Sequence, residues 1–120
     1  EADTILLYVN PFKRADIEAA VFTTPNMAYL TREYEAFLHD SDMPGETVLK
    51  VNLECFDPGH VDRHLVEEQF VSRFLKYKSL IAEHYYDQSF HIEFRFTEPR
   101  GLDFYLMKGR PKRLVDRREH

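Results

Sequence analysis

The sequence predicts a single α+β domain, α/β-like in the order of its elements, with a mixed four-stranded sheet. Three observations predict it: two alternating runs near the C-terminus, an unbroken apolar run near the N-terminus, and helical periodicity between them. With 120 residues, 43% hydrophobic and 14% aromatic, the chain can bury a core without metal or disulfide support.

The two alternating runs lie at residues 90–96 and 102–107. In the first, four apolar side chains alternate with His91, Glu93 and Arg95, which is the period of a half-buried strand. Residues 97–101 between the runs contain a proline and a glycine, which are typical of a turn. The pattern predicts a β-hairpin.

Two further strands are predicted upstream. Residues 4–9 read Thr-Ile-Leu-Leu-Tyr-Val, a short apolar run without alternation, which indicates a strand buried on both faces at the centre of the sheet. The following Asn-Pro pair ends it, because proline cannot donate to a ladder. Residues 47–56 alternate, with Cys55 on the apolar side, and we expect that cysteine to be a buried small hydrophobe.

Helical spacing of apolar residues fills the intervals. It predicts helices at residues 13–22, at 25–38 after a Thr24 N-cap, and at 61–85 after an Asp-Pro-Gly start. A short basic helix could follow at 111–119. The predicted order is β-α-β-α-β-β with this possible C-terminal helix, and a strand–crossover–strand unit of that kind is usually right-handed and parallel.

The charge divides the chain into a body and a tail. Residues 1–107 carry 10 Lys/Arg and 19 Asp/Glu, a net charge of −9, whereas residues 108–120 carry 6 and 2, a net charge of +4. We therefore distinguish a domain at 1–107 from a basic C-terminal tail at 108–120. Such an imbalance indicates a nucleic-acid or acidic-protein partner for the tail, and the alternative is that the tail folds back on the acidic body.

The tail contains a short motif, Lys-Gly-Arg-Pro-Lys-Arg, at residues 108–113. Its Gly-Arg-Pro centre resembles an AT-hook, which inserts arginine into a narrow minor groove. The broader interpretation is a basic patch that contacts phosphates without reading sequence.

Other chemistry has weaker support in the sequence. His60 and His64 are four residues apart, a spacing that can hold a metal, but Val61 stands where a zinc protease needs glutamate, and we expect no metal. His84 or His91 with a carboxylate such as Glu93 could form an acid–base pair in a small enzyme. The lone cysteine excludes an internal disulfide, and no apolar run reaches the ~18 residues of a membrane span.

One family resemblance adds to these observations. The run Ile-Leu-Leu-Tyr-Val-Asn-Pro-Phe-Lys at residues 5–13, with the closing segment 90–109, is similar to thioredoxin-like mitochondrial ribosomal proteins of the large-subunit protein fifty-three type. The resemblance implies a thioredoxin-like fold without redox cysteines, a mitochondrial location, and a structural role among neighbouring proteins and rRNA. The sheet order of Alba-type nucleic-acid binders remains an alternative.

Together with the basic tail, the resemblance implies a non-catalytic structural subunit of a large ribonucleoprotein assembly, in the first place the mitochondrial ribosome, without cofactor and without membrane contact. A free-standing nucleic-acid-binding or regulatory domain is the alternative, with a cytoplasmic or nuclear location, and the small enzyme is the second alternative. Six basic residues of the tail are predicted to bind RNA: Lys108, Arg110, Lys112, Arg113, Arg117 and Arg118.

Overall fold

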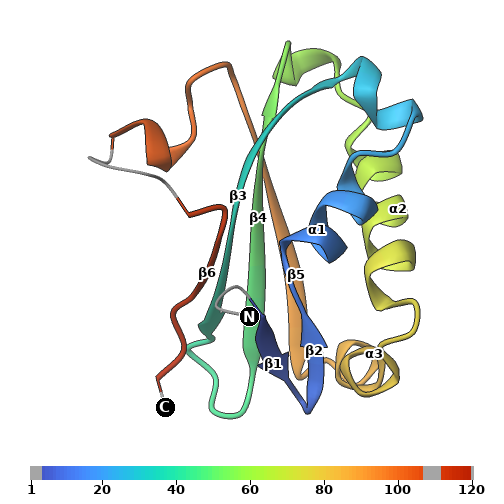
Figure 1. Ribbon diagram of the computed structural model, residues 1–120, viewed down its shortest axis with the longest axis vertical. Coiled ribbons are helices and arrows are strands. Elements are labelled where there is room, and N and C mark those ends of the chain that lie inside the picture. The colour runs from blue at the N-terminus through green and yellow to red at the C-terminus, as the bar shows by residue number, and fades with distance from the viewer. Residues whose placement is uncertain (1–3, 107–111, 120) are drawn as a thin grey trace.

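The centre of the molecule is a mixed four-stranded sheet in the order β5-β4-β3-β6 (Figure 1), seen in a computed structural model that describes residues 4–106 and 112–119. The strands are β3 (Leu30–Asp40), β4 (Thr47–Cys55), β5 (Phe90–Thr97) and β6 (Leu114–Asp116). The β3–β4 pair is antiparallel, whereas the β4–β5 and β3–β6 pairs are parallel. The prediction of one α+β domain with a mixed four-stranded sheet is therefore confirmed.

Three helices cover one face of the sheet (Figure 1): α1 (Arg14–Val21), α2 (Arg63–Leu75) and α3 (Ser79–Tyr86). The core lies between them and the strands. On α2, Phe70 and Phe74 are fully buried, and their rings stack at 5.2 Å. Phe70 also meets Phe94 of β5 edge-on, and Phe74 meets Phe12 in the same way. These ring pairs join α2 to the sheet and to the N-terminal segment.

The N-terminal run is not a central strand of the sheet, so that prediction is wrong. Strand β1 (Ile5–Leu7) instead pairs antiparallel with β2 (Asn10–Phe12) in a separate two-stranded hairpin. Ile5 and Leu7 are buried, but Leu6 between them is 61% exposed and lies opposite Pro11. An apolar run of this length does not show whether one face or both are buried, and here only one is.

The helix predicted at residues 25–38 is also wrong. Only a 3-10 turn, Pro25–Ala28, precedes the strand β3. Residues 34–38 are all buried, Tyr34, Ala36 and Leu38 in the hydrophobic core and Glu35 and Phe37 between them, so both faces of this stretch are covered and pairing with β4 makes it a strand. A register shift between Leu30 and Tyr34 bends the start of the strand.

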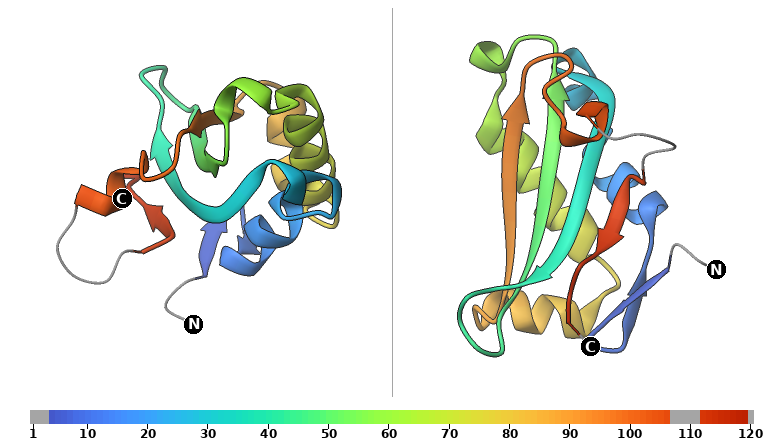
Figure 2. Two further views of the ribbon diagram at one scale, coloured as in Figure 1. Left: turned by 90° about the horizontal axis from the view of Figure 1, so that it is seen from above. Right: turned by 90° about the vertical axis from the view of Figure 1, so that its left-hand side faces the viewer.

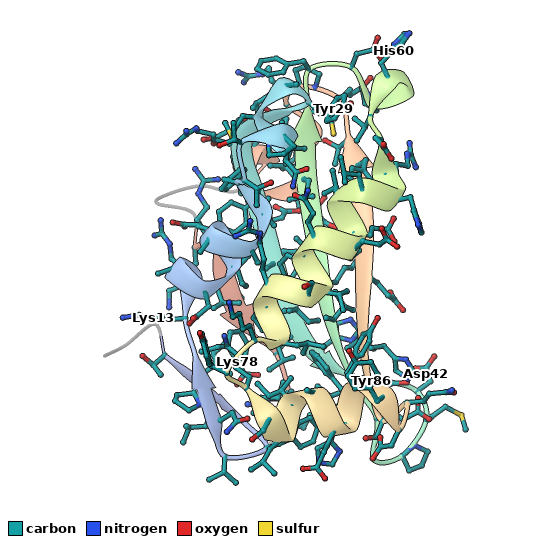
Figure 3. The ribbon with its side chains drawn as sticks, turned by 90° about the vertical axis from the view of Figure 1, so that its right-hand side faces the viewer. Lys13, Tyr29, Asp42, His60, Lys78 and Tyr86 are labelled. Carbon is teal, nitrogen blue, oxygen red and sulfur yellow. The ribbon has the colours of Figure 1, made fainter. Side chains whose placement is uncertain are left out.

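The long helix predicted at residues 61–85 is broken into α2 and α3. The break lies at residues 76–78, where Tyr77 has a left-handed backbone with φ of +66°. α3 then runs across the lower end of the sheet toward β5 (Figure 3). Apolar residues continue at helical spacing through the corner, which is why the pattern alone does not reveal it.

The C-terminal third differs from the predicted hairpin. Strand β5 forms, but its partner is β4, and Asp103–Leu106 is a 3-10 turn rather than a returning strand. This turn lies on the side of the sheet opposite the helices (Figure 1), and its Phe104 is buried. Two neighbouring backbone N–H groups of the turn, those of Asp103 and Phe104, donate to the buried Glu35 carboxylate of β3.

The last described segment is a strand and not the predicted short helix. Ala36, Phe37 and Leu38 of β3 pair with residues 114–116 of β6, which forms one edge of the sheet (Figure 2). Residues 112–119 therefore fold onto the body of the molecule. The observed order of elements also differs from the predicted β-α-β-α-β-β order.

Candidate functional site

A cavity of about 660 Å³ lies among β2, α1, the last turns of α2 and the corner before α3. Its space comes from small side chains: α1 contributes Ala19 and Ala20, and α2 contributes Ser72. Because these three side chains are small, a hollow remains between α1 and α2 although the two helices contact each other. A volume of this size is typical of small-molecule and cofactor sites.

The charged groups of the cavity are mostly cations. Arg73, Lys76 and Lys78 line it, and Asp16 is its single carboxylate. Arg73 and Lys76 are three residues apart and so share one face at the C-terminal end of α2, where the helix dipole favours positive charge. In the described part of the chain neither of these two side chains has an ion-pair partner.

Lys78 is the buried cation of the site. Its residue is only 9% exposed, its Nζ lies 3.4 Å from Asp16 Oδ1, and the same Nζ is 5.0 Å from the centre of the Phe74 ring. Lys78 is also the N-cap residue of α3, at the end of a helix where a positive charge is unfavourable. An anion in the cavity would stabilise this lysine further than the single carboxylate does.

The walls of the cavity are tied together by two side chains. Asp16 Oδ2 accepts the Lys13 N–H at 2.9 Å, while its other oxygen contacts Lys78. Asn10 Oδ1 accepts the N–H groups of Leu80 and Ile81 at 3.0 and 3.3 Å, and so joins the N-terminal hairpin to the start of α3. Lys13 and Lys78 lie on the same side of the molecule, near the lower end of α1 and the α2–α3 corner (Figure 3). These hydrogen bonds connect the N-terminal hairpin, α1 and the start of α3 around the cavity.

The four described basic residues of the tail, Lys112, Arg113, Arg117 and Arg118, lie elsewhere, on either side of the edge strand β6. Arg113 pairs with Glu33 at 2.9 Å and stacks over Phe104, and Arg118 pairs with Asp116 at 2.8 Å. The hydrogen bonds that the Arg118 guanidinium donates to the Asp116 carboxylate raise the pKa of Arg118. Arg117 lies over the Phe37 ring and is exposed, as is Lys112. Lys108 and Arg110 fall outside the described residues. RNA binding by these six residues stays a prediction.

The histidines considered from the sequence do not come together. His60 contacts Asp57, and His64 contacts Glu68 at 3.0 Å, so each has its own carboxylate. His91 Nε2 lies 2.6 Å from Glu46. Within residues 4–106 and 112–119, no three His, Cys, Asp or Glu side chains are placed to hold a metal.

His84 takes part in a local polar turn. Its Nδ1 lies 2.7 Å from Ser89 Oγ, and that hydroxyl also donates to Asp87. The composition is that of a Ser-His-Asp set, but the aspartate binds the serine instead of orienting the imidazole. The His84 ring stacks on Tyr8 at 3.6 Å, and we interpret the group as closing the end of α3.

Cys55 is buried at the end of β4, as the sequence predicts. Burial raises the pKa of its thiol to about 11. The cysteine is therefore protonated and enclosed at neutral pH, which disfavours a nucleophilic role.

The cavity residues were not identified from the sequence, although a signal for them exists. Residues 73–78 read Arg-Phe-Leu-Lys-Tyr-Lys, and the segment 69–82 contains these three cations and no carboxylate, in a body that is otherwise acidic. Helical periodicity placed the segment in the middle of a helix, where cations at the surface are ordinary. The break of the helix at Tyr77 places Lys78 beside the last turn of α2, where it lines the same cavity as Arg73 and Lys76.

No protein-family model matches the sequence, and no curated protein matches it significantly. Among the described residues, no helix is both long enough and apolar enough to cross a bilayer. The function is therefore inferred from the cavity and its charges.

Proposed function

We propose that this protein is a non-catalytic, RNA-binding subunit of a ribonucleoprotein assembly, and that the cavity between α1 and α2 holds phosphate groups of the RNA. The observation that carries the proposal is the composition of the cavity, with Arg73, Lys76 and Lys78 set against Asp16 alone. Lysine and arginine bind phosphate oxygens through charge-assisted hydrogen bonds.

Two further observations support phosphate binding over catalysis. Arg73 and Lys76 are exposed and have no ion-pair partner among the described residues, so a ligand need not displace a carboxylate to reach them. The described lining of the cavity contains no histidine and no cysteine, the residues most often used as general base or as thiol nucleophile. The site is built to attract an anion rather than to transform one.

Binding of a fluorescein-labelled RNA of about 12 nucleotides, followed by fluorescence anisotropy, tests the cavity. The double variant Arg73→Gln/Lys76→Gln removes two cations from it, whereas Lys112→Gln/Arg117→Gln removes two from the β6 edge. We expect the first to weaken binding on the order of tenfold at low salt and to reduce the salt slope by about 1.4, because each single-strand phosphate contact contributes ~0.7.

The matched pair also separates the cavity from the tail. Equal or greater loss in the β6-edge variant would assign RNA binding to the C-terminal residues and not to the cavity. Absence of binding by the unaltered protein at low salt would overturn the proposal altogether.

Membership of an assembly needs a second measurement. The native protein, extracted at low salt, is expected to sediment on a sucrose gradient with a large particle and to be released by RNase or high salt. Sedimentation as a lone 14.3 kDa chain under these conditions would contradict the assembly and leave a free-standing binding domain.

A further inference from the structure

Tyr77, at the mouth of the cavity, is in an unusual position for an aromatic residue. It lies in the corner between α2 and α3 with φ of +66°, and its side chain belongs to a residue that is 93% exposed. A bulky residue rarely adopts this conformation, in which glycine or asparagine is more favourable. The ring gains no burial that would offset the strain.

Tyr8 has the same kind of backbone conformation as Tyr77, but its ring is packed within the fold. Tyr8 also has a positive φ, +51°, but its ring stacks on His84 at 3.6 Å and packs against the core. The Tyr77 ring has one described neighbour, the Lys76 ammonium, 5.3 Å from the ring centre. Residues with a strained backbone are concentrated at binding and switch sites, and Tyr77 has no packing within the fold that offsets its strain.

The surroundings of Tyr77 indicate what would cover the ring. It is flanked by Lys76 and Lys78, and both line the cavity together with Arg73. An exposed aromatic ring beside a cationic groove is the arrangement by which proteins bind single-stranded nucleic acid, with a base stacked on the ring and the backbone along the cations. In a duplex the faces of the bases are already stacked on one another and are closed to the ring.

We propose, on the basis of the proposed function, that the cavity binds single-stranded RNA and that one base stacks on Tyr77 while the adjoining phosphate lies among Arg73, Lys76 and Lys78. The volume of about 660 Å³ is sufficient for a nucleotide-sized group. Tyr77 is then a specificity residue for strandedness, and the cations supply attraction that does not depend on it.

The test compares Tyr77→Phe and Tyr77→Asn against a labelled single-stranded RNA of 12 nucleotides and against the duplex of the same sequence. Asparagine tolerates the left-handed backbone, so this variant keeps the corner while removing the ring. We expect Tyr77→Asn to weaken single-strand binding by roughly 5- to 100-fold and Tyr77→Phe to change it little, since stacking needs only the ring. Duplex binding should be weaker than single-strand binding and equal in all three proteins.

The outcomes distinguish this inference from the proposed function. If Tyr77→Asn binds the single strand as the unaltered protein does, while Arg73→Gln/Lys76→Gln loses affinity, stacking is overturned and the phosphate site stands. If the unaltered protein binds the single-stranded RNA and the duplex with equal affinity, the inference is overturned in the same way. If the unaltered protein binds neither RNA at low salt, the proposed function fails and the inference fails with it.

Discussion

Glu54 shows how a single buried residue can hold several segments on the face of the sheet opposite the helices. Its carboxylate, on a residue that is 5% exposed, accepts three hydrogen bonds: from Thr31 Oγ1 at 2.7 Å, the Arg100 N–H at 2.8 Å and the Tyr105 hydroxyl at 2.9 Å. The donors come from three different segments. One carboxylate on β4 therefore joins β3, through Thr31, to the loop after β5, through Arg100, and to the last 3-10 turn, through Tyr105.

These bonds make the stability of the protein depend on pH. Burial by itself raises the pKa of Glu54, but the three hydrogen bonds outweigh it, and the pKa is lowered. The carboxylate therefore contributes stability above the unfolded glutamate pKa of about 4.3, and this contribution is lost as the pH falls through the lower folded value. We expect Glu54→Gln to reduce the free energy of unfolding by about 1–3 kcal/mol at pH 7, with a smaller difference in acid.

Urea denaturation between pH 7 and pH 3 measures the Glu54 effect. The exposed Glu93 of β5 offers a matched control, and Glu93→Gln should change the free energy of unfolding by less than about 0.5 kcal/mol. Curves for Glu54→Gln and the unaltered protein that stay parallel over the whole range would contradict the linkage.

At the scale of elements, the N-terminal hairpin has a strained turn. Its two connecting residues, Tyr8 and Val9, have φ of +51° and +68°, which is the conformation that Asn-Gly ordinarily supplies in a two-residue β-turn. Val9 is β-branched and 79% exposed, so it bears the strain without packing in return. Asn10 directly after the turn binds the start of α3, which gives the hairpin its place in the fold.

Replacing the strained valine should stabilise the protein. We expect Val9→Gly to raise the free energy of unfolding by about 0.5–1 kcal/mol, because glycine adopts positive φ without steric cost and this outweighs its larger entropy loss. Leu6→Gly, at an exposed and extended position of β1, should instead lower it. Denaturant unfolding of the two variants checks the signs, and a loss of stability in both would show that the turn is not strained.

At the scale of the whole molecule, the C-terminal segment belongs to the sheet. Residues 114–116 pair with β3, and the Ala36 N–H donates to Arg113 O and the Arg117 N–H to Leu38 O, both at 2.7 Å, at either end of this pairing. The basic segment thus folds back on the acidic body, the alternative that the charge imbalance left open. The strand β6, which these arginines flank, lies at one edge of the sheet, whereas α1 and α2, which line the cationic cavity, cover one face of it (Figures 1 and 2).

Truncation of the β6 core residue tests this integration. Leu114 is 9% exposed and belongs to the hydrophobic core, so Leu114→Ala should lower the free energy of unfolding by about 2 kcal/mol. Lys112→Ala, two residues away and exposed, is the control and should have little effect. Thermal and urea unfolding give the comparison; an unchanged midpoint for Leu114→Ala would mean that the segment does not contribute to the fold in solution.

The sequence by itself determined the α+β class, the helix α1, the strands β4 and β5 and the burial of Cys55, because in these segments the apolar residues follow a single period. It did not determine that both faces of β4 are covered, since Asn52 and Glu54 on its polar side are also buried. Tertiary structure decided the remainder. Residues 30–40 have apolar residues at helical spacing, and pairing with β4 makes them a strand. The corner at Tyr77, the returning strand β6 and the cavity arise from contacts between residues far apart in the chain, such as Lys78 with Asp16 and Asn10 with Leu80. Local patterns record which face a residue prefers, but they do not record which distant segment will cover it.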